Sequence, residues 1–372
     1  MTALIESVET LLVDLPTIRP HKLSMATMAT QTLVIVRLKC ADGIEGIGEA
    51  TTIGGLAYGP ESPESMKVNI DTYLAPALVG LAADNVNLAM ARLDKLAKGN
   101  VIAKSALETA LLDAQGKRLG VPLATLLGGA RHDHLPVLWT LASGDTDKDI
   151  EEARKRLEQR RHRDFKLKIG ANEVDHDVRH VAAIKAALGD RASVRVDVNQ
   201  AWDEATAVRA IAALEEAGVD LIEQPIPAHE RAGLARLANR FEVTMLADEG
   251  VQDLRCGLAL IESGFSGAFA LKIAKSAGPR GALRLAHLAD AGGIGLYGGT
   301  MLEGTIGTAA SLHAWATLPE MAWGTEMFGP LLLTDDIVTT PLRYDDFGVA
   351  LPQGPGLGLE LDHDKLREYA RS

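Results

Sequence analysis

Short apolar runs recur from about residue 137 onward at an interval of roughly 25 to 29 residues, the length of one strand, one helix and two short loops. The segments between them are helical in pattern: Val208, Ile211, Ala212 and Leu214 follow spacings of three and four before Gly218. Eight such units fit one closed parallel barrel, but an open doubly wound sheet has the same alternation, so the period alone leaves closure undecided. The runs occupy residues 137–141, 165–169, 194–198, 221–223, 245–248, 268–273, 294–297 and 322–324.

The first 130 residues follow a different pattern. Residues 32–38 form a strand candidate and residues 43–48 a turn with a further edge, whereas residues 65–98 and 104–120 have helical periodicity. Strands followed by helices indicate an α+β unit. We therefore predict three parts: an N-terminal α+β capping domain (1–130), a catalytic barrel (131–330) and a C-terminal segment that packs back on the capping domain (331–372).

Composition excludes several classes of function. With 50 acidic against 38 basic residues and a formal net charge of −12, the chain is not predicted to bind nucleic acid, whose phosphates need concentrated Lys and Arg. The basic cluster at residues 160–163 is interpreted as a solvated helix end. No stretch approaches about 18 consecutive apolar residues, so no membrane span is predicted. The N-terminus does not resemble a secretory signal, and two distant cysteines, Cys40 and Cys256, predict no disulfide, which is typical of a reducing cytoplasm.

Acidic residues interrupt the apolar runs at the ends of three successive strands: Asp197, Glu223 and Asp248. In a barrel the C-terminal ends of the strands converge on one face, where active sites are built. Three carboxylates packed together would repel one another without a cation. An all-oxygen set of this kind suits Mg²⁺ or Mn²⁺, with open positions left for water or substrate.

Lysines lie on the strands to either side of these acids. Lys166 and Lys168 are two residues apart and so point to the same face of the preceding strand, and Lys272 lies on the strand that follows. Two adjacent lysines are expected to lower each other's pKa, which makes an amine a usable proton carrier near neutral pH. One charged residue at a strand end is more often part of a loop salt bridge, but six at the ends of five successive strands predict a catalytic site.

Five other signals are weaker. Glu326 ends the eighth run and is a candidate for the site, and Glu249 is either a partner of a lysine or a loop charge. Residues 298–300 follow the seventh run and could bind an anionic part of the substrate. The histidines show no metal-ligand spacing, and the glycine-rich residues 354–358 lack the strand-to-helix context of a phosphate cradle.

These residues, in this order, resemble the enolase superfamily in its muconate-cycloisomerase subgroup, over essentially the whole chain. One departure is Gly250, where many relatives have serine; it leaves the neighbouring metal ligand in place. The resemblance implies an α/β fold, a TIM-like (β/α)7β barrel with an α+β capping domain built from the N-terminal region and the C-terminal tail. The matching motifs are Lys166-Leu-Lys168, Asp197-Val-Asn199, Glu223-Gln-Pro225, Asp248-Glu249, Lys272 and residues 19–22, 51–59, 122–129, 139–145 and 324–330.

The resemblance also implies a reaction. In cis,cis-muconate one carboxylate oxygen adds to C4 and closes muconolactone, while negative charge moves onto the other carboxylate as an enolate. Three carboxylates would hold the Mn²⁺ or Mg²⁺ that stabilises this charge, and Lys168 would protonate C5. Lys166 would tune Lys168, with Lys272 and Glu326 giving further stabilisation. The implied metal ligands are Asp197, Glu223 and Asp248, and the implied substrate-binding residues are Ile53, Tyr58, Asn199, Thr300 and Phe328, under loops around residues 19–27 and 51–60 that cap the barrel mouth.

The resemblance further implies a cytoplasmic homo-oligomer, octameric in this subgroup, that acts on a small dicarboxylate in the catechol branch of the β-ketoadipate pathway of aromatic catabolism. Chloromuconate cycloisomerases usually differ at residues 56–58, which favours unsubstituted muconate. The alternatives on the same scaffold are a chloromuconate cycloisomerase, a dipeptide epimerase, an N-acylamino acid racemase and an o-succinylbenzoate synthase. A metal-binding scaffold without turnover would not need paired lysines, and a Schiff-base aldolase would not need three carboxylates.

Overall fold

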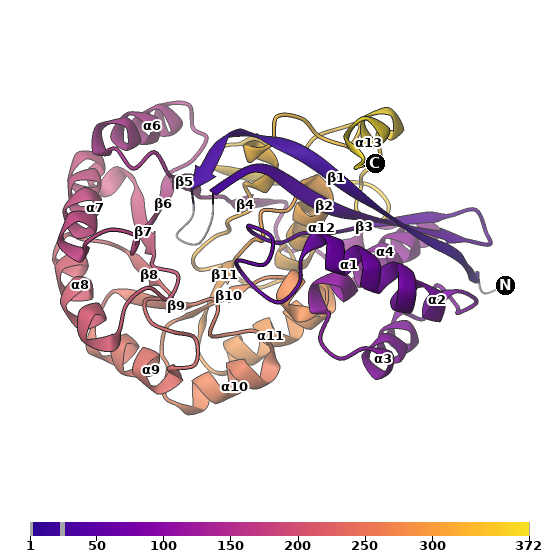
Figure 1. Cartoon of the computed structure of the whole chain (residues 1–372), viewed down its shortest axis with the longest axis horizontal. Coiled ribbons are helices and arrows are strands. Elements are labelled where there is room, and N and C mark those ends of the chain that lie inside the picture. The colour runs from indigo at the N-terminus through magenta and orange to yellow at the C-terminus, as the bar shows by residue number, and fades with distance from the viewer. Residues whose placement is uncertain (1–2, 23–26, 372) are drawn as a thin grey trace.

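A computed structural model describes residues 3–22 and 27–371 of the chain. A curved parallel sheet with helices around its outside lies beside a long, twisted antiparallel sheet that carries its own helices (Figure 1). Both the N-terminus and the C-terminal helix lie on the side of the antiparallel sheet (Figure 1). No helix in the described ranges is long and apolar enough to cross a membrane.

The N-terminal region contains an antiparallel sheet in the order β1–β2–β3. Helix α4 packs closely on this sheet, because a Cβ atom at Gly46 would lie 2.0 Å from the carbonyl oxygen of Ala110, and one at Gly48 would lie 2.0 Å from that of Ala106. Glycine on the strand and alanine at four-residue spacing on the helix therefore set the distance between the two layers. The strands are β1 (Ile5–Lys22), β2 (Thr27–Cys40) and β3 (Glu45–Ala50); the helices are α1 (Pro63–Asn69), the π-helix η1 (Ile70–Leu74), α2 (Ala75–Leu78), α3 (Val86–Leu96), α4 (Val101–Leu119) and α5 (Leu123–Leu126).

The helical stretch expected over residues 65–98 is interrupted. Helix α2 ends at Leu78, and α3 begins only at Val86. Gly80 lies between them with φ at 80°, a left-handed conformation that stops a helix and that glycine adopts without strain. The second expected helix is present as α4, which ends at Leu119 and is followed by Gly120 with φ at 68°.

The second region is the predicted parallel α/β unit. Its seven strands are hydrogen-bonded in chain order, from β5 to β11. Three of the outer helices begin at an aspartate whose side chain accepts backbone N–H bonds of the first turn, namely Asp145, Asp203 and Asp253. The strands are β5 (Trp139–Leu141), β6 (Asp164–Lys168), β7 (Ser193–Asp197), β8 (Leu221–Glu223), β9 (Thr244–Ala247), β10 (Ala268–Leu271) and β11 (Gly295–Gly298); the helices are α6 (Thr146–Glu158), α7 (Val174–Leu188), α8 (Glu204–Glu216), α9 (Arg231–Arg240), α10 (Leu254–Glu262), α11 (Pro279–Ala291) and α12 (Thr305–Trp315), with short 3₁₀ turns η2 (Gly189–Arg191), η3 (Ala274–Ser276) and η4 (Gly329–Leu332).

An eighth strand was expected at residues 322–324, and this position is wrong. Residues 322 and 323 form a turn, and Gly324 has φ at 62°. The closing contact falls one residue later, where Thr325 forms parallel bridges with Gly298 of β11 on one side and with Val137, just before β5, on the other. One residue in extended conformation therefore joins the two edges of the curved sheet.

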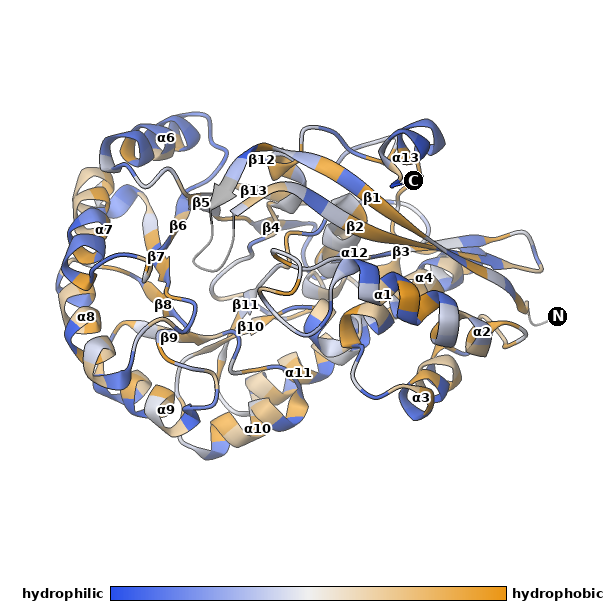
Figure 2. Ribbon diagram, viewed as in Figure 1, coloured by the Kyte–Doolittle hydropathy of each residue, from blue (hydrophilic) through white to orange (hydrophobic). Residues whose placement is uncertain are grey.

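The C-terminal residues pack on both regions. Strands β12 (Tyr344–Asp345) and β13 (Gly348–Ala350) form a small sheet with β4 (His134–Pro136). Helix α13 (His363–Tyr369) lies against β1, and the following Arg371 pairs with Asp14 at 2.7 Å. Hydrophilic residues dominate α6 and α13, whereas hydrophobic ones run along β1 and β2 (Figure 2). Both cysteines are free thiols, Cys40 buried and Cys256 partly exposed.

One expectation about the basic cluster at residues 160–163 is wrong. Its arginines are exposed, but the side chain of His162 is only 1% exposed. Its Nδ1 lies 2.9 Å from the carbonyl oxygen of Val137, and its ring lies 5.2 Å from that of Trp139. Burial, together with the charges of Arg156 and Arg161, lowers the pKa of His162 to about 4.

This burial predicts a pH dependence of stability. Between about pH 6.5, where an unfolded histidine titrates, and pH 4, the unfolded chain binds a proton that folded His162 does not, so the free energy of unfolding falls as the pH falls. Replacing His162 by asparagine, which keeps a donor, should reduce the loss of stability between pH 7 and pH 5 by about 2 kcal/mol. Urea unfolding at the two pH values measures this difference. The matched control is exposed His363, whose replacement by asparagine should leave the pH dependence as in the wild type; an unchanged dependence in the His162 variant contradicts the prediction.

Candidate active site

Five neighbouring strands of the curved sheet end in charged residues. Asp197 and Glu223 are the last residues of β7 and β8 and pair in register, and Asp248 follows the last residue of β9. Lys168 ends β6 in register with Asp197, and Lys272 follows β10. Across β6 to β10 the order is therefore lysine, three acids, lysine, as expected from the parallel pattern.

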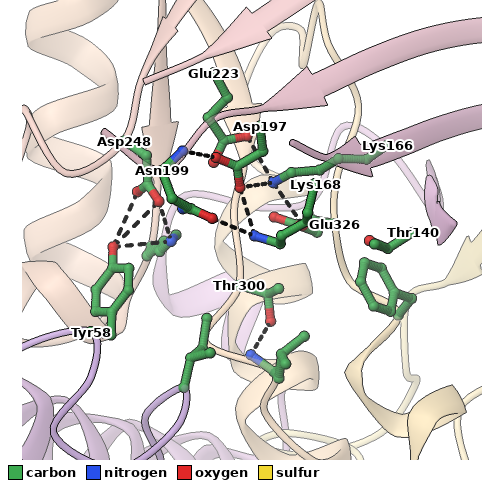
Figure 3. A pocket seen from close by; sticks show the side chains of 14 residues that line it. Tyr58, Thr140, Lys166, Lys168, Asp197, Asn199, Glu223, Asp248, Thr300 and Glu326 are labelled. Atoms are coloured by element: carbon green, nitrogen blue, oxygen red, sulfur yellow. Dashed lines mark hydrogen bonds and ion pairs between the residues drawn. The ribbon is translucent and has the colours of Figure 1, made fainter. Parts of the chain in front are cut away.

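All of the predicted site residues line one pocket at these strand ends (Figure 3). Ile53 and Tyr58 reach it from the N-terminal region, and Thr300, Glu326 and Phe328 from segments after β11. Two further residues, Thr140 on β5 and Leu302, complete the lining. Residues 23–26, part of the expected capping segment 19–27, lie outside the described residues; before them, Arg19 contacts Glu152 of α6 at 2.9 Å. The predicted lining residues are Ile53, Tyr58, Lys166, Lys168, Asp197, Asn199, Glu223, Asp248, Lys272, Thr300, Glu326 and Phe328.

Lys166 is buried among carboxylates. Its Nζ donates to Glu326 Oε1 at 2.9 Å and lies 2.7 Å from Glu223 Oε2 and 3.2 Å from Asp197 Oδ2. Burial alone would lower the pKa of Lys166, but the charges of Glu223, Glu326 and Asp197 hold it well above the ordinary value. The expectation that the two lysines lower each other's pKa is therefore wrong for Lys166, because three acids face it.

Lys168 is more accessible than the other two predicted lysines. Its side chain is 14% exposed, against 2% for Lys166 and 3% for Lys272. Its Nζ donates to Asp197 Oδ2 at 2.6 Å and to Asn199 Oδ1 at 3.3 Å. The ammonium group therefore lies at the mouth of the carboxylate cluster, where it can exchange protons with solvent.

Asp248 is held from two sides. Lys272 donates to its Oδ2 at 2.6 Å, and Lys275 to its Oδ1 at 2.6 Å and to its backbone oxygen at 2.7 Å. Burial alone would raise the pKa of Asp248, but these two ammonium groups hold it well below its usual range. Tyr58 donates toward Asp248 at 3.3 Å, and its own hydroxyl accepts from Lys272 at 3.1 Å.

Lys275 is a site residue that the pattern of apolar runs does not predict. It lies in the 3₁₀ turn η3 after β10, outside the apolar run, so the alternation of strand residues does not point to it. Its spacing of three from Lys272 was the available signal, because one turn places both side chains on the same side of the segment.

The loops that follow β7 and β8 contain residues in a left-handed backbone conformation. The buried side-chain amide of Gln224 binds the backbone of the loop that follows β9. Asn199, Gln200 and Gln224 all have positive φ, at 45°, 67° and 35°, a conformation that non-glycine residues adopt at a cost of about 1 to 3 kcal/mol. The Gln224 Oε1 atom accepts from the backbone N–H groups of Asp248 at 3.1 Å and Gly250 at 2.9 Å. Gly250 is thus held by the same amide as Asp248.

Glu249, which the sequence left open as a partner of a lysine or a loop charge, accepts a hydrogen bond from Asn199 Nδ2 at 3.1 Å. Burial, with the adjacent charge of Asp248, raises its pKa to about 7. Thr300 uses its hydroxyl within its own loop, donating to Glu303 and accepting from Leu302 N–H at 2.8 Å.

The three strand-end acids fit a divalent cation by the chemistry of their donors. Each of the three acids forms an ion pair with a lysine. In residues 3–22 and 27–371, no set of three or more Asp, Glu, His or Cys side chains has the spacing that would hold a metal ion. Burial, with the charge of Asp197, raises the pKa of Glu223 to about 8, and its buried Oε2 has no hydrogen-bond partner although Lys166 is within ion-pair distance. Hard oxygen donors that repel one another are the set that Mg²⁺ or Mn²⁺ stabilises.

Comparison with known proteins covers the whole chain. Residues 7–128 match the family described as mandelate racemase / muconate lactonizing enzyme, N-terminal domain, and residues 148–365 match the family described as enolase C-terminal domain-like. Muconate cycloisomerase 1 of Pseudomonas putida is 61% identical over 100% of this chain and 99% of its own. A chloromuconate cycloisomerase of Pseudomonas sp. (strain P51) is 47% identical over 99% of each chain.

Comparison with solved structures points to the same relatives as the comparison of sequences. The crystal structure of muconate lactonizing enzyme from Pseudomonas fluorescens complexed with muconolactone superposes with a TM-score of 0.98 and 60% identity, and each chain covers 100% of the other. The curved parallel sheet and the separate antiparallel region are therefore shared along the full length.

Proposed function

This chain belongs to the mandelate racemase / muconate lactonizing enzyme family, and from that premise we propose that it is a muconate cycloisomerase, an isomerase that closes cis,cis-muconate to muconolactone. The observation that carries the proposal is the row of charges across β6 to β10, in which Lys168 and Lys272 flank three acids in one pocket. A dicarboxylate substrate fits a pocket of this kind because its two anionic ends need local cations in a protein of net charge −12.

A divalent metal ion belongs to this site. Asp197, Glu223 and Asp248 would hold it, and when bound it would supply positive charge where negative charge develops on the substrate carboxylate. We propose Mn²⁺ or Mg²⁺, because the three donors are hard oxygens. Lys275 and Gln224 would keep Asp248 in place through the hydrogen bonds that they make to it.

Lys168 is the proposed general acid. After one carboxylate oxygen of muconate has added to C4, an ammonium proton of Lys168 goes to C5, and the neutral amine regains a proton from solvent through its exposed edge. Lys166 would contribute positive charge beside Lys168, from the ammonium group that it places against Glu326. Lys272 supplies charge from the opposite side, and Glu326 orients Lys166 through its 2.9 Å bond.

Specificity belongs to the remaining lining residues. We propose that Ile53, Tyr58, Asn199, Thr300 and Phe328 bind the substrate, with the apolar ones setting the shape of the pocket. Unsubstituted muconate is favoured over chlorinated muconate, because the identity is 61% to a muconate cycloisomerase and 44–47% to chloromuconate cycloisomerases. We also propose that the enzyme is a cytoplasmic homo-oligomer, octameric as in its subgroup.

Reaction in deuterated buffer tests the proposal. The product should be muconolactone that carries one deuterium at C5, because the proton that Lys168 delivers comes from solvent. Proton NMR of the isolated product measures this label. Recovery of unchanged muconate, with metal present, would contradict the proposal. Dipeptides and N-acylamino acids would then be the substrates to test.

A further inference from the structure

The segment of residues 300–304, here called the substrate loop, connects β11 to α12 and places Thr300 and Leu302 in the lining of the pocket. Leu302 has φ at 61°, a conformation that costs free energy for a branched side chain. Such a conformation persists only where the surroundings hold it. The groups that hold the substrate loop therefore decide how Leu302 and Thr300 face the substrate.

Two side chains from the N-terminal sheet form hydrogen bonds to the backbone of this loop and of the first turn of α12. Gln31 of β2 is 2% exposed, and its Nε2 donates to the carbonyl oxygens of Leu302 at 2.8 Å and of Met301 at 3.3 Å. Glu49 of β3 is 3% exposed and accepts from the backbone N–H groups of Gly304 at 2.6 Å and Gly307 at 2.9 Å. The loop is thus bound through its carbonyls by one residue and through its amides by the other.

The sequence of the loop is adapted to this contact. A Cβ atom at Gly304 would lie 2.8 Å from Leu33 Cδ1 and 3.3 Å from Glu49 Oε2, so only glycine lets the carboxylate approach the start of α12. The Leu302 N–H, by contrast, is satisfied inside the loop by Thr300. Gln31 therefore supplies the contact from outside that fixes the Leu302 peptide.

A small cavity lies next to the contact between Gln31 and Leu302. Both residues line it together with Met28 and, from the C-terminal segment, Leu332 and Leu333. Without the bond from Gln31, the Leu302 carbonyl would lose the hydrogen bond that fixes it beside this cavity.

We propose that Gln31 and Glu49 are positioning residues for substrate binding, which hold the substrate loop so that Thr300 and Leu302 contact the dicarboxylate. The proposal rests on the proposed function, because it assigns the pocket to muconate. Neither Gln31 nor Glu49 lines the pocket that holds the three acids and the lysines, so their effect should fall on substrate affinity and not on the chemical step.

The test is the variant Gln31→Met, which keeps the length of the side chain and removes both donors. We expect KM for cis,cis-muconate to rise about tenfold, with kcat within about threefold and Mn²⁺ affinity unchanged. Glu49→Gln, which places an amide against two N–H groups, should shift KM in the same direction. The matched control is Thr32→Val, because Thr32 is the next residue of β2, does not line the pocket and donates 2.6 Å to Asp14 Oδ1 of β1.

Hydrogen–deuterium exchange gives a readout independent of turnover. Backbone amides of residues 301–307 should exchange faster in folded Gln31→Met, whereas those of β7 and β8 keep the wild-type rate. Gln31→Asn, one methylene shorter, serves the same comparison if the methionine variant does not fold. Wild-type KM and unchanged loop exchange in a folded variant, or a loss confined to kcat, would overturn the proposal. A wild-type enzyme that leaves muconate unchanged would refute the proposed function, and the exchange experiment would still decide whether the two residues hold the loop.

Discussion

Replacing Lys168 by alanine is expected to lower kcat for cis,cis-muconate by about 10³-fold or more while leaving Mn²⁺ affinity within a few-fold of the wild type. The lysine is the ammonium group at the open edge of the acid cluster, and no other lysine of the pocket is as accessible to solvent. Because the three acids remain, the metal site is retained, and the loss falls on proton delivery. Initial rates, together with a Mn²⁺ titration, separate the two effects.

A matched control for this variant is Lys185→Ala. Lys185 lies on α7 of the same barrel and pairs with Asp220 at 3.2 Å, away from the pocket. Its replacement should leave turnover within about twofold, since Lys185 does not line the pocket and its side chain, 15% exposed, is buried to the same degree as that of Lys168. Near-normal turnover in Lys168→Ala would remove Lys168 from the role of general acid.

Replacing Glu223 by glutamine is expected to weaken Mn²⁺ binding by about 100-fold or more and to abolish measurable turnover at moderate metal concentration. The change removes the central acid of the row and leaves Lys166 without the partner 2.7 Å away. Titration of free Mn²⁺ by electron paramagnetic resonance measures the affinity directly, and excess metal should restore part of the activity.

Glu108→Gln is the control for loss of a buried acid. Glu108 is 4% exposed and pairs with the partly exposed Arg280 at 2.9 Å between α4 and α11, so this variant also removes the charge of a buried acid from an ion pair. It should reduce stability and leave Mn²⁺ affinity unchanged. Equal Mn²⁺ affinity in wild type and Glu223→Gln would contradict the assignment of Glu223 as a ligand.

The charged row was predictable because ionised residues are costly inside apolar strands. Asp197, Glu223 and Lys166 interrupt runs of valine, leucine and isoleucine, and the parallel order of the strands then brings their ends together. The same reasoning could not reach Lys275, which lies in a turn. The error on the pKa of Lys166 has a related cause, since the spacing to Lys168 is visible in the sequence but the facing Glu326 comes from a segment 160 residues away.

Contacts between the N-terminal region and the barrel could not be predicted from the sequence either. Gln31 and Leu302 are separated by 271 positions, and neither belongs to a pattern that indicates pairing. The position of the closing strand was wrong because Gly324 takes a left-handed conformation and moves the bridge to Thr325. His162 sits in a run of arginines, and only the packing of Trp139 and Val137 buries it.

The most direct test of the proposed activity is the loss of the conjugated-diene absorbance of cis,cis-muconate, followed with Mn²⁺ or Mg²⁺ and then with excess chelator. We predict rapid loss with metal and almost none after chelation, because the charge that develops on the substrate needs the cation held by Asp197, Glu223 and Asp248. Metal-loaded enzyme that leaves the absorbance unchanged, or turnover that persists in chelator, would contradict this account.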